Sequence, residues 1–415
     1  MAFTPKDCHV LMNALVRQAT GEQAITVIDS SSFVSAGELV LQTGMENVFN
    51  SLNIVLGRLI VANRPYNAKL TLMDEIDTGA YTNRLRKVSF YTSNTDPSGA
   101  FNTDLFTNLA DGYTSGDNGG VSTKSQWEQH VKNVVEVNFG VSSTWQYCVT
   151  MYEDAIKLAF RDENEFARFI SGYLVEHAND LESQRESWNR MLLCNKIASV
   201  YDESAKMSGS VVNLTELYNT TFGTEYTSEE LRTTYLKDFL KFFTATFKLA
   251  SEHMTERTTN YHNPLTKTVD GVTYSVVRHT PYRDQRVYLF DELFINAESE
   301  VMPEIFNPQY LDIDTQYERV TYWQSVNDRS AIKFKPAVTN ADGEQETGDE
   351  VDLSYVVGMI TDRDGLVSHM QLERVDTTPL EARKHYRNTW HTFMKGGISD
   401  NTENCIIFIM EDPTP

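Results

Sequence analysis

An unusually long helical pattern runs through residues 162–199. Asp162 and Glu165 have the spacing of a capping box, which begins a helix. A continuous helix here would be on the order of 55 Å long, at about 1.5 Å per residue. The pattern favours a rigid beam with Phe169 and Trp188 mostly buried, and the alternative is an ordinary core helix of a bundle. The mainly apolar stripe, at spacings of three, four and seven, comprises Phe166, Phe169, Ile170, Tyr173, Leu174, His177, Leu181, Trp188, Met191 and Leu192.

Strand-like runs precede this helix. Residues 69–73, 84–91 and 131–141 alternate polar with apolar or β-branched side chains, as exposed strands do. Residues 93–125 between them are polar and contain several glycines. This order predicts a long two-stranded arm with a polar tip. Because a two-stranded ribbon is at best marginally stable alone, either another molecule covers the arm or it packs on its own domain.

The N-terminal part of the chain reads as a mainly helical arm. Residues 10–19 form a short amphipathic pattern, and residues 48–62 carry apolar side chains at helical spacing. The polar cluster Asp29-Ser30-Ser31-Ser32 between them predicts a loop.

A second helix and several short strands are expected in the C-terminal half. Thr227 and Glu230 mark the beginning of a helix that runs to about Met254. Beyond it, Asp-Gly pairs at 270–271, 342–343 and 364–365 predict turns between short strands. Residues 383–393 and 405–410 predict two terminal strands, joined by Gly396-Gly397 and a polar turn.

Length, charge and cysteine content limit the function. The 415 residues predict two or three domains, and a formal net charge of -22 argues against a protein that grips nucleic acid over its whole face. An acidic wall past which DNA slides is compatible with this charge. No signal peptide and no apolar run of about 18 residues are present, so we expect neither export nor a membrane partner. The four cysteines, which show no CxxC pairing, are Cys8, Cys148, Cys194 and Cys405.

No motif for catalysis, a cofactor or a metal emerges. Lys124 lies in a glycine-containing loop but lacks the preceding glycine of a phosphate-binding loop. Asp362 and Asp364 resemble part of a calcium loop but lack its terminal glutamate, so we expect a turn. Cys194 is expected to be a small buried side chain. The chain is therefore predicted not to be an enzyme and to have no cofactor, no metal and no catalytic residues.

The order of these elements resembles that of the major capsid proteins of tailed bacteriophages, whose capsid fold is shared with herpesvirus floor domains. Several stretches are similar to the capsid proteins of small short-tailed phages. They are residues 165–170 and 191–193 in the long helix, residues 238–241, residues 288–293, and residues 386–391 followed by 405–408 at the C-terminus.

The resemblance implies an α+β fold with five parts. They are an N-terminal arm (1–62), an extended β-loop (63–150), a spine helix with part of a peripheral domain (151–225), an axial domain (226–375) and the C-terminal strands of the peripheral domain (376–415). It also implies a homo-oligomer of pentamers and hexamers that forms an icosahedral shell around double-stranded DNA. A scaffolding protein and a portal would be further partners. The protein would be made in the host bacterial cytoplasm and reside in the virion.

One strand of the β-loop concentrates positive charge in an otherwise acidic chain. Charge would steer this strand to a neighbouring copy, and apolar burial would supply most of the affinity. The inter-subunit contact candidates are therefore Arg84, Leu85, Arg86, Lys87, Val88 and Phe90.

Two other functions compete with shell formation. A tail or connector component of a phage would share the polar surface and the long helix, but would form rings of one fixed size. A cytoplasmic hydrolase would gather its residues only in three dimensions, at a concave pocket with perturbed carboxylates.

The charge leads to a testable expectation for assembly. Copies that each carry a net charge of -22 repel one another when packed side by side. Salt or divalent cations should therefore accelerate shell formation by screening this repulsion. The measurement is the rate of assembly, followed by light scattering across a salt series. Equal rates at very low and moderate ionic strength would contradict the expectation.

Overall fold

The structure is a computed structural model with both α-helices and β-sheets, which confirms the α+β prediction. It describes residues 5–21, 25–28, 30–43, 70–77, 84–91, 134–140, 143–154, 157, 163–269, 272–292, 295, 316–339 and 345–412. The predictions for residues 48–62 and 93–125 lie outside these ranges.

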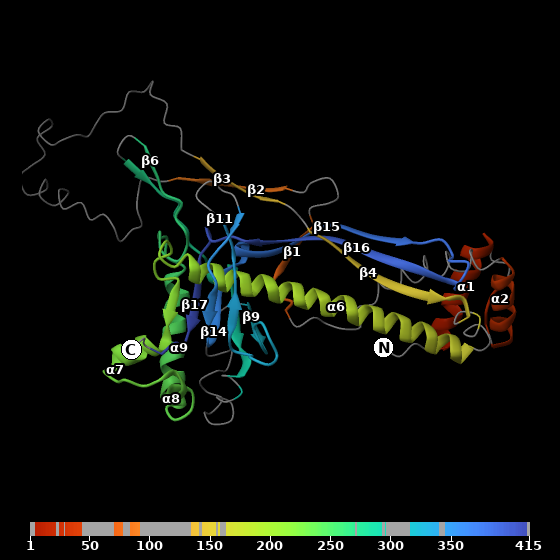
Figure 1. The fold of residues 1–415 in the computed structure, drawn as a ribbon, viewed down its shortest axis with the longest axis horizontal. Coiled ribbons are helices and arrows are strands. Elements are labelled where there is room, and N and C mark those ends of the chain that lie inside the picture. The colour runs from red at the N-terminus through yellow and green to blue at the C-terminus, as the bar shows by residue number, and fades with distance from the viewer. Residues whose placement is uncertain are drawn as a thin grey trace, which may run out of the picture.

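The longest element is α6, Glu163–Asp202, a continuous helix of 40 residues. At 1.5 Å per residue it is about 60 Å long, and it runs along much of the elongated molecule (Figure 1). The predicted long helix is therefore confirmed. Trp188 is partly buried against the core, whereas the side chain of Phe169 lies outside the described ones.

The C-terminal third of α6 is buried on several sides at once, and not only along one stripe. Leu192 faces β16 at Gly397, and the Cys194 thiol donates to the carbonyl of Trp323. Lys196, about one turn after Leu192, is fully buried, and its ammonium reaches the loop that follows β16. This part of the helix is surrounded by segments from far along the chain, so its burial exceeds what its own periodicity predicts.

A four-stranded sheet lies along α6 (Figure 1), in the order β1-β15-β16-β4. β15 and β16 are long antiparallel neighbours, paired from Leu366↔Ser399 to Thr377↔Thr389. β4 is antiparallel to β16, and β1 is parallel to β15. The strands are β1 Asp74–Asp77, β15 Leu366–Thr377, β16 Tyr386–Ser399 and β4 Ser143–Tyr152.

The glycine pair expected between the two terminal strands lies instead within β16. A Cβ at Gly396 would overlap the imidazole of His369 on the paired strand, and a Cβ at Gly397 would overlap the side chain of Leu192 on α6. The two glycines therefore allow the sheet to approach its neighbours closely. The prediction that this pair joins two strands was wrong because a glycine pair marks close packing as readily as a bend.

The second large sheet has five strands in the order β5-β17-β14-β8-β9. β17 pairs with β14 and β5, so the last two strands of the chain belong to different sheets, which corrects the predicted joined pair. β8, β14 and β17 are buried along their whole lengths. The strands are β5 Val211–Asn213, β17 Cys405–Ile409, β14 Val356–Asp362, β8 Gln285–Phe290 and β9 Gln316–Val320.

Three helices lie at the same end of the molecule as this sheet (Figure 1): α7 Leu214–Phe222, α8 Ser228–Arg232 and α9 Leu236–His253. The predicted start of the second helix is confirmed, since Thr227 and Glu230 form a capping box. The helix is, however, broken into α8 and α9. Phe243 and Phe247 of α9 pack against Phe408 of β17, with ring centroids 5.9 and 5.7 Å apart.

The N-terminal helices α1, Pro5–Thr20, and α2, Ser30–Gln42, lie at the opposite end of the molecule (Figure 1). The first helix was predicted, but the serine cluster was expected in a loop and begins α2 instead. Phe33, Ala36 and Val40, at spacings of three and four, are fully buried along α2. Serines tolerate a helix N-terminus well, so the apolar spacing that follows decides their conformation.

Small hairpins complete the fold. β6 Lys267–Val269 pairs with β7 Val272–Tyr274, and β11 Ala337–Thr339 pairs with β12 Gln345–Thr347; the Asp-Gly pairs at 270–271 and 342–343 lie outside the described residues. The third turn is the short helix Arg363–Gly365, held by the Asp362 side chain. β10 Ile332–Phe334 pairs with β13 Val351–Leu353, and β2 Arg84–Phe90 pairs with β3 Val134–Gly140. The exposed strand expected at 69–73 is not found: residues 70–73 are not a strand, Leu70 and Met73 are buried, and β1 begins at Asp74.

The contact between α6 and β16 can be tested by adding one methyl group. Gly397→Ala should lower the free energy of unfolding by about 1 to 3 kcal/mol, because the new Cβ forces Leu192 out of its packed position. Gly172→Ala in α6 is the control, since no atom of the described residues outside the helix's own turn lies within 4 Å of its Cβ position. It should stabilise the helix by up to about 1 kcal/mol. Chemical denaturation measures both, and a Gly397→Ala variant as stable as the wild type would refute the packing role.

Candidate functional site: a two-stranded arm and its buried anchor

The arm predicted from the sequence is present as a two-stranded sheet of its own. β2 and β3 are antiparallel, in a register from Arg84↔Gly140 to Phe90↔Val134. Among the described strands, neither pairs with any other. The two strands lie beside the body, on the side where β6 and β11 are found (Figure 1).

Alternate residues of β2 face opposite ways. Leu85, Lys87 and Ser89 are half-buried or buried, whereas Arg86, Val88 and Phe90 are exposed. This period of two follows from the pleat of a strand. One face of the arm therefore lies on its own body, as the second alternative for the ribbon expects, and the other faces solvent in the single chain.

The outward face combines an ion pair with large apolar side chains. Arg86 pairs with Glu136 across the two strands at 2.6 Å. Val88, Phe90 and Val134 are 46%, 60% and 49% exposed. Phe90 and Val134 are directly opposite in the register, so the apolar groups form one patch. Val134 was not among the predicted contact residues, although its place at the start of an alternating run was a usable signal.

The six predicted contact residues therefore divide between the two faces. Val88 and Phe90 lie on the outward face, as a contact residue requires, and Arg86 lies there with a partner inside the arm. Leu85 and Lys87 face the body. The side chain of Arg84 lies outside the described ones. Of the three positive charges on β2, at least Arg86 and Lys87 are paired within the chain. The exposed apolar patch is therefore the larger part of the surface that the arm has available for another molecule.

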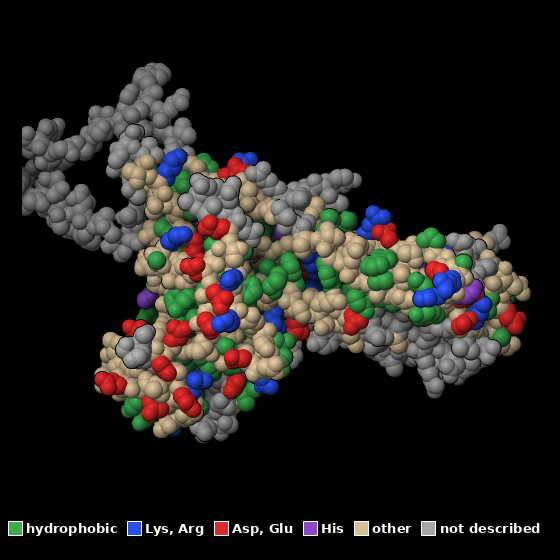
Figure 2. All heavy atoms as spheres, viewed as in Figure 1, with side chains coloured by type: hydrophobic (Ala, Val, Ile, Leu, Met, Phe, Trp, Pro, Cys, Tyr) green, Lys and Arg blue, Asp and Glu red, His purple; other side chains and the backbone are tan. Residues whose placement is uncertain are grey.

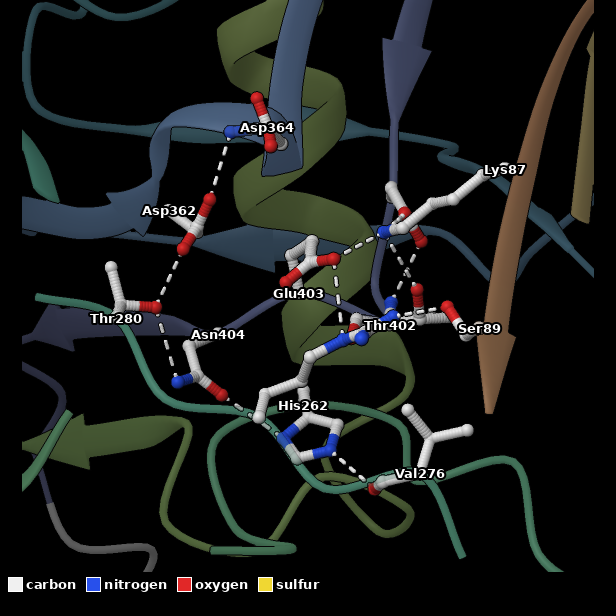
Figure 3. Close-up of polar contacts among 12 residues, drawn as sticks. Lys87, Ser89, His262, Val276, Thr280, Asp362, Asp364, Thr402, Glu403 and Asn404 are labelled. Atoms are coloured by element: carbon white, nitrogen blue, oxygen red, sulfur yellow. Dashed lines mark hydrogen bonds and ion pairs between the residues drawn. The ribbon is translucent and has the colours of Figure 1, made fainter. Parts of the chain in front are cut away.

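The inward face is held by a charge cluster in the loop between β16 and β17 (Figure 3). Lys87 pairs with the carboxylates of Asp400 and Glu403, and its ammonium donates to the Thr402 hydroxyl at 3.2 Å. Arg278 also pairs with Glu403, at 3.2 Å, and donates to the Ser89 hydroxyl at 2.6 Å. Two neighbouring inward residues of β2 are therefore tied to the body by charge-assisted hydrogen bonds.

The same loop is bound from its other side by α6. The Lys196 ammonium donates to the backbone carbonyl of Asp400 at 2.7 Å and to the Asn401 side chain at 3.0 Å. Asn401 in turn donates to Glu203 at 2.6 Å. Residues 400–404 thus connect the long helix to the arm.

A second chain of polar contacts continues from this loop to β14 (Figure 3). Asn404 donates to the Thr280 hydroxyl at 3.2 Å, and Thr280 donates to Asp362 at 2.6 Å. The fully buried ring of His262 lies 3.0 Å from the Asn404 side-chain oxygen and 3.0 Å from the Val276 carbonyl. These residues come from four separate segments, which is why the sequence did not indicate them.

For the buried groups in and around the 400–404 loop, burial and the neighbouring polar groups shift the side-chain pKa values in opposite directions. Burial alone would raise the pKa of Asp400, but the Lys87 ammonium and the hydrogen bonds from Lys87 and Thr402 outweigh it and hold the pKa below its usual value. Burial lowers the pKa of Lys196 and of His262, although the carbonyls around His262 act against this. Burial raises the pKa of Cys194 to about 12, in agreement with its predicted buried position.

A groove of about 980 Å³ opens between α6 and the four-stranded sheet. Trp145, Trp188 and Phe393 supply aromatic surface, and Trp145 and Phe393 pack with centroids 5.2 Å apart. Arg185 bridges β1 and α6 here by pairing with Glu75 at 2.6 Å. In the described part of the chain, no group of three or more histidine, cysteine or acidic side chains could hold a metal ion. No described helix is long and apolar enough to cross a membrane.

Structural comparison finds phage capsids. The capsid structure of Staphylococcus phage Andhra has 12% sequence identity and a TM-score of 0.47, with 85% of each chain covered. That of the cyanophage P-SCSP1u has 10% identity and a TM-score of 0.41, covering 82% of this chain and 87% of that one. The mature capsid of bacteriophage PhiM1 has 8% identity and a TM-score of 0.38, covering 84% and 89%. No family model and no curated protein matches the sequence. The structures found are of the same kind as the family named from the order of elements.

The neutral, buried His262 makes stability depend on pH. In the unfolded chain its imidazole titrates near pH 6.5, and in the folded chain its pKa is lower. Its contribution is therefore complete above about pH 6.5 and is lost as the pH falls from there towards the folded-state pKa. Chemical denaturation at pH 7.5 and 5.5 should show that the free energy of unfolding falls less between these two pH values for His262→Gln than for wild type. The exposed His279→Gln variant is the control and should lose as much as wild type; equal losses in all three would remove His262 as the cause.

Proposed function

We propose that the chain is a major capsid protein that self-assembles as pentamers and hexamers into an icosahedral shell around the double-stranded DNA of a tailed bacteriophage. The observation that carries this proposal is the outward face of the β2–β3 arm. Val88, Phe90 and Val134 form an apolar patch on a sheet that has no second layer on that side in the described structure. Exposed patches of this kind indicate an interaction surface. A neighbouring copy of the subunit is the partner that completes it.

The proposal also gives each part of the elongated body a role. The N-terminal arm (1–62) and the extended β-loop (63–150) reach neighbouring subunits. The spine helix with part of a peripheral domain (151–225) and the C-terminal strands (376–415) stiffen the subunit, and the axial domain (226–375) closes around the local symmetry axes. The support is that α6 and the four-stranded sheet form a long, continuous body, with the arm beside it and the five-stranded sheet at one end.

The surface charge suits a container for DNA. Figure 2 shows acidic side chains gathered over the end of the body where α7 and α8 lie. A surface of this sign does not hold packaged DNA tightly, because tight binding needs clustered lysine and arginine. A scaffolding protein and a portal are proposed as further partners, and the virion as the final location after synthesis in the host cytoplasm.

A structural role also fits the polar residues better than catalysis does. The buried groups around Asp400 bind one another across four segments, and their contacts account for their charges within the chain. Electron microscopy of the expressed protein separates the candidate functions. Closed shells support a capsid protein, rings of one fixed size a tail or connector component, and dispersed particles under all salt conditions would count against both.

The outward patch can be tested with a polar substitution. Phe90→Ser should abolish or slow shell formation at least tenfold, because the apolar patch supplies most of the affinity between copies. The subunit should remain folded, with an unchanged thermal midpoint, since Phe90 is exposed in the single chain. Phe90→Leu keeps an apolar side chain and should still assemble. Normal shells from Phe90→Ser, measured by sedimentation and microscopy, would show that this patch is not the contact.

A further inference from the structure

The inward face of the arm, which lies on the subunit's own body, makes polar contacts that have no part in the proposed contact between copies. Besides the half-buried Leu85, it offers the body Lys87, bound to Asp400 and Glu403, and Ser89, which accepts from Arg278. In the described structure these side chains meet the body at the 400–404 loop and at the segment that contains Arg278 (Figure 3). The polar contacts of the arm are therefore concentrated at one small region of an inward face whose other side chains, Leu85, Val135, Val137 and Phe139, are apolar and half-buried.

The receiving side of this contact is rigid. Besides its bonds to Lys196, the 400–404 loop is held through its backbone: Asp400 donates to the Gly365 carbonyl at 3.0 Å, and Asn401 accepts from the backbone of Asn263 at 2.7 Å. The Thr402 backbone also donates to the Asp400 carboxylate at 2.8 Å. A loop tied to so many segments keeps its position whether or not the arm is present.

Asp400 and Glu403 would be affected differently if the arm, and Lys87 with it, moved away from the body. Glu403 would keep Arg278 as its partner. Asp400, whose side chain is 3% exposed, has Lys87 as the cation paired with its carboxylate, because Lys196 binds its main-chain oxygen instead. Removing one partner of a buried ion pair leaves an uncompensated charge, which is strongly unfavourable. Arg86 and Glu136, by contrast, are both on the arm and partly exposed, so their pair moves with it and holds nothing to the body.

We propose that Lys87 is a positioning residue that latches the β2–β3 arm to its own subunit through Asp400, so that a single subunit presents Val88 and Phe90 outward before any neighbour binds. The latch is a property of the unassembled chain. It rests on the proposed function only for the role of the outward patch. Fixing the arm in advance lowers the ordering cost of each contact between copies.

Amide hydrogen exchange of the unassembled protein, kept at low ionic strength, tests the latch. The variant is Lys87→Met combined with Asp400→Asn, which removes both charges and leaves no buried carboxylate unpaired. Amides of residues 84–90 and 134–140 should exchange at least tenfold faster than in wild type, because a free two-stranded sheet is only marginally stable. Amides of α6 and β14 should keep their protection to within about threefold.

Two controls sharpen the result. Lys87→Arg keeps a cation at the same place and should retain wild-type protection in both strands. Arg86→Met removes a positive charge from the outward face of the same strand and should not release the arm. Unchanged protection in the double variant would overturn the latch, and so would equal acceleration in α6, which would make the pair part of the core. Because no assembly is measured, either failure is separate from that of the Phe90→Ser experiment.

Discussion

The burial of the C-terminal third of α6 is the constraint on which the rest of the structure depends. The helix is packed by β16 at Leu192, by the segment around Trp323 at Cys194, and by the 400–404 loop at Lys196. A lysine in this position is tolerable only because its ammonium has oxygen partners on that loop. The two sheets are thereby joined through one helix.

The acidic groups buried near the 400–404 loop are paired with cations, whereas the chain as a whole has a large excess of negative charge. The chain carries a formal net charge of -22, which makes copies repel one another and which dissolved salt screens. The interior of the 400–404 region pairs its acidic groups with Lys87 and Arg278 at close range. In the arm, Lys87 on the inward side binds the body, and the outward side carries the exposed Val88, Phe90 and Val134 beside the Arg86–Glu136 pair.

Periodicity and composition predicted the elements well where local patterns decide. The spacing of three and four predicted α6, the alternation in residues 84–90 predicted β2, and the pair Thr227 and Glu230 predicted the start of α8. The six candidate contact residues of β2 divide between its two faces, because alternation shows that two faces exist but not which of them meets the body. The anchor was missed, because Lys87 was expected to contact another subunit and Asp400, 313 positions away, has no local motif.

The sequence by itself determined the length of α6, the two-stranded arm and the acidic net charge, because each depends on residues near one another in the chain or on their sum. The tertiary structure decided what Gly396 and Gly397 do, which strand β17 joins and which face of β2 is buried. These features depend on atoms supplied by distant segments. A glycine in a sequence is compatible with both a turn and close packing, and the sequence of a strand does not specify which strand it pairs with. Both are decided by the side chains and strands that lie opposite in the folded chain.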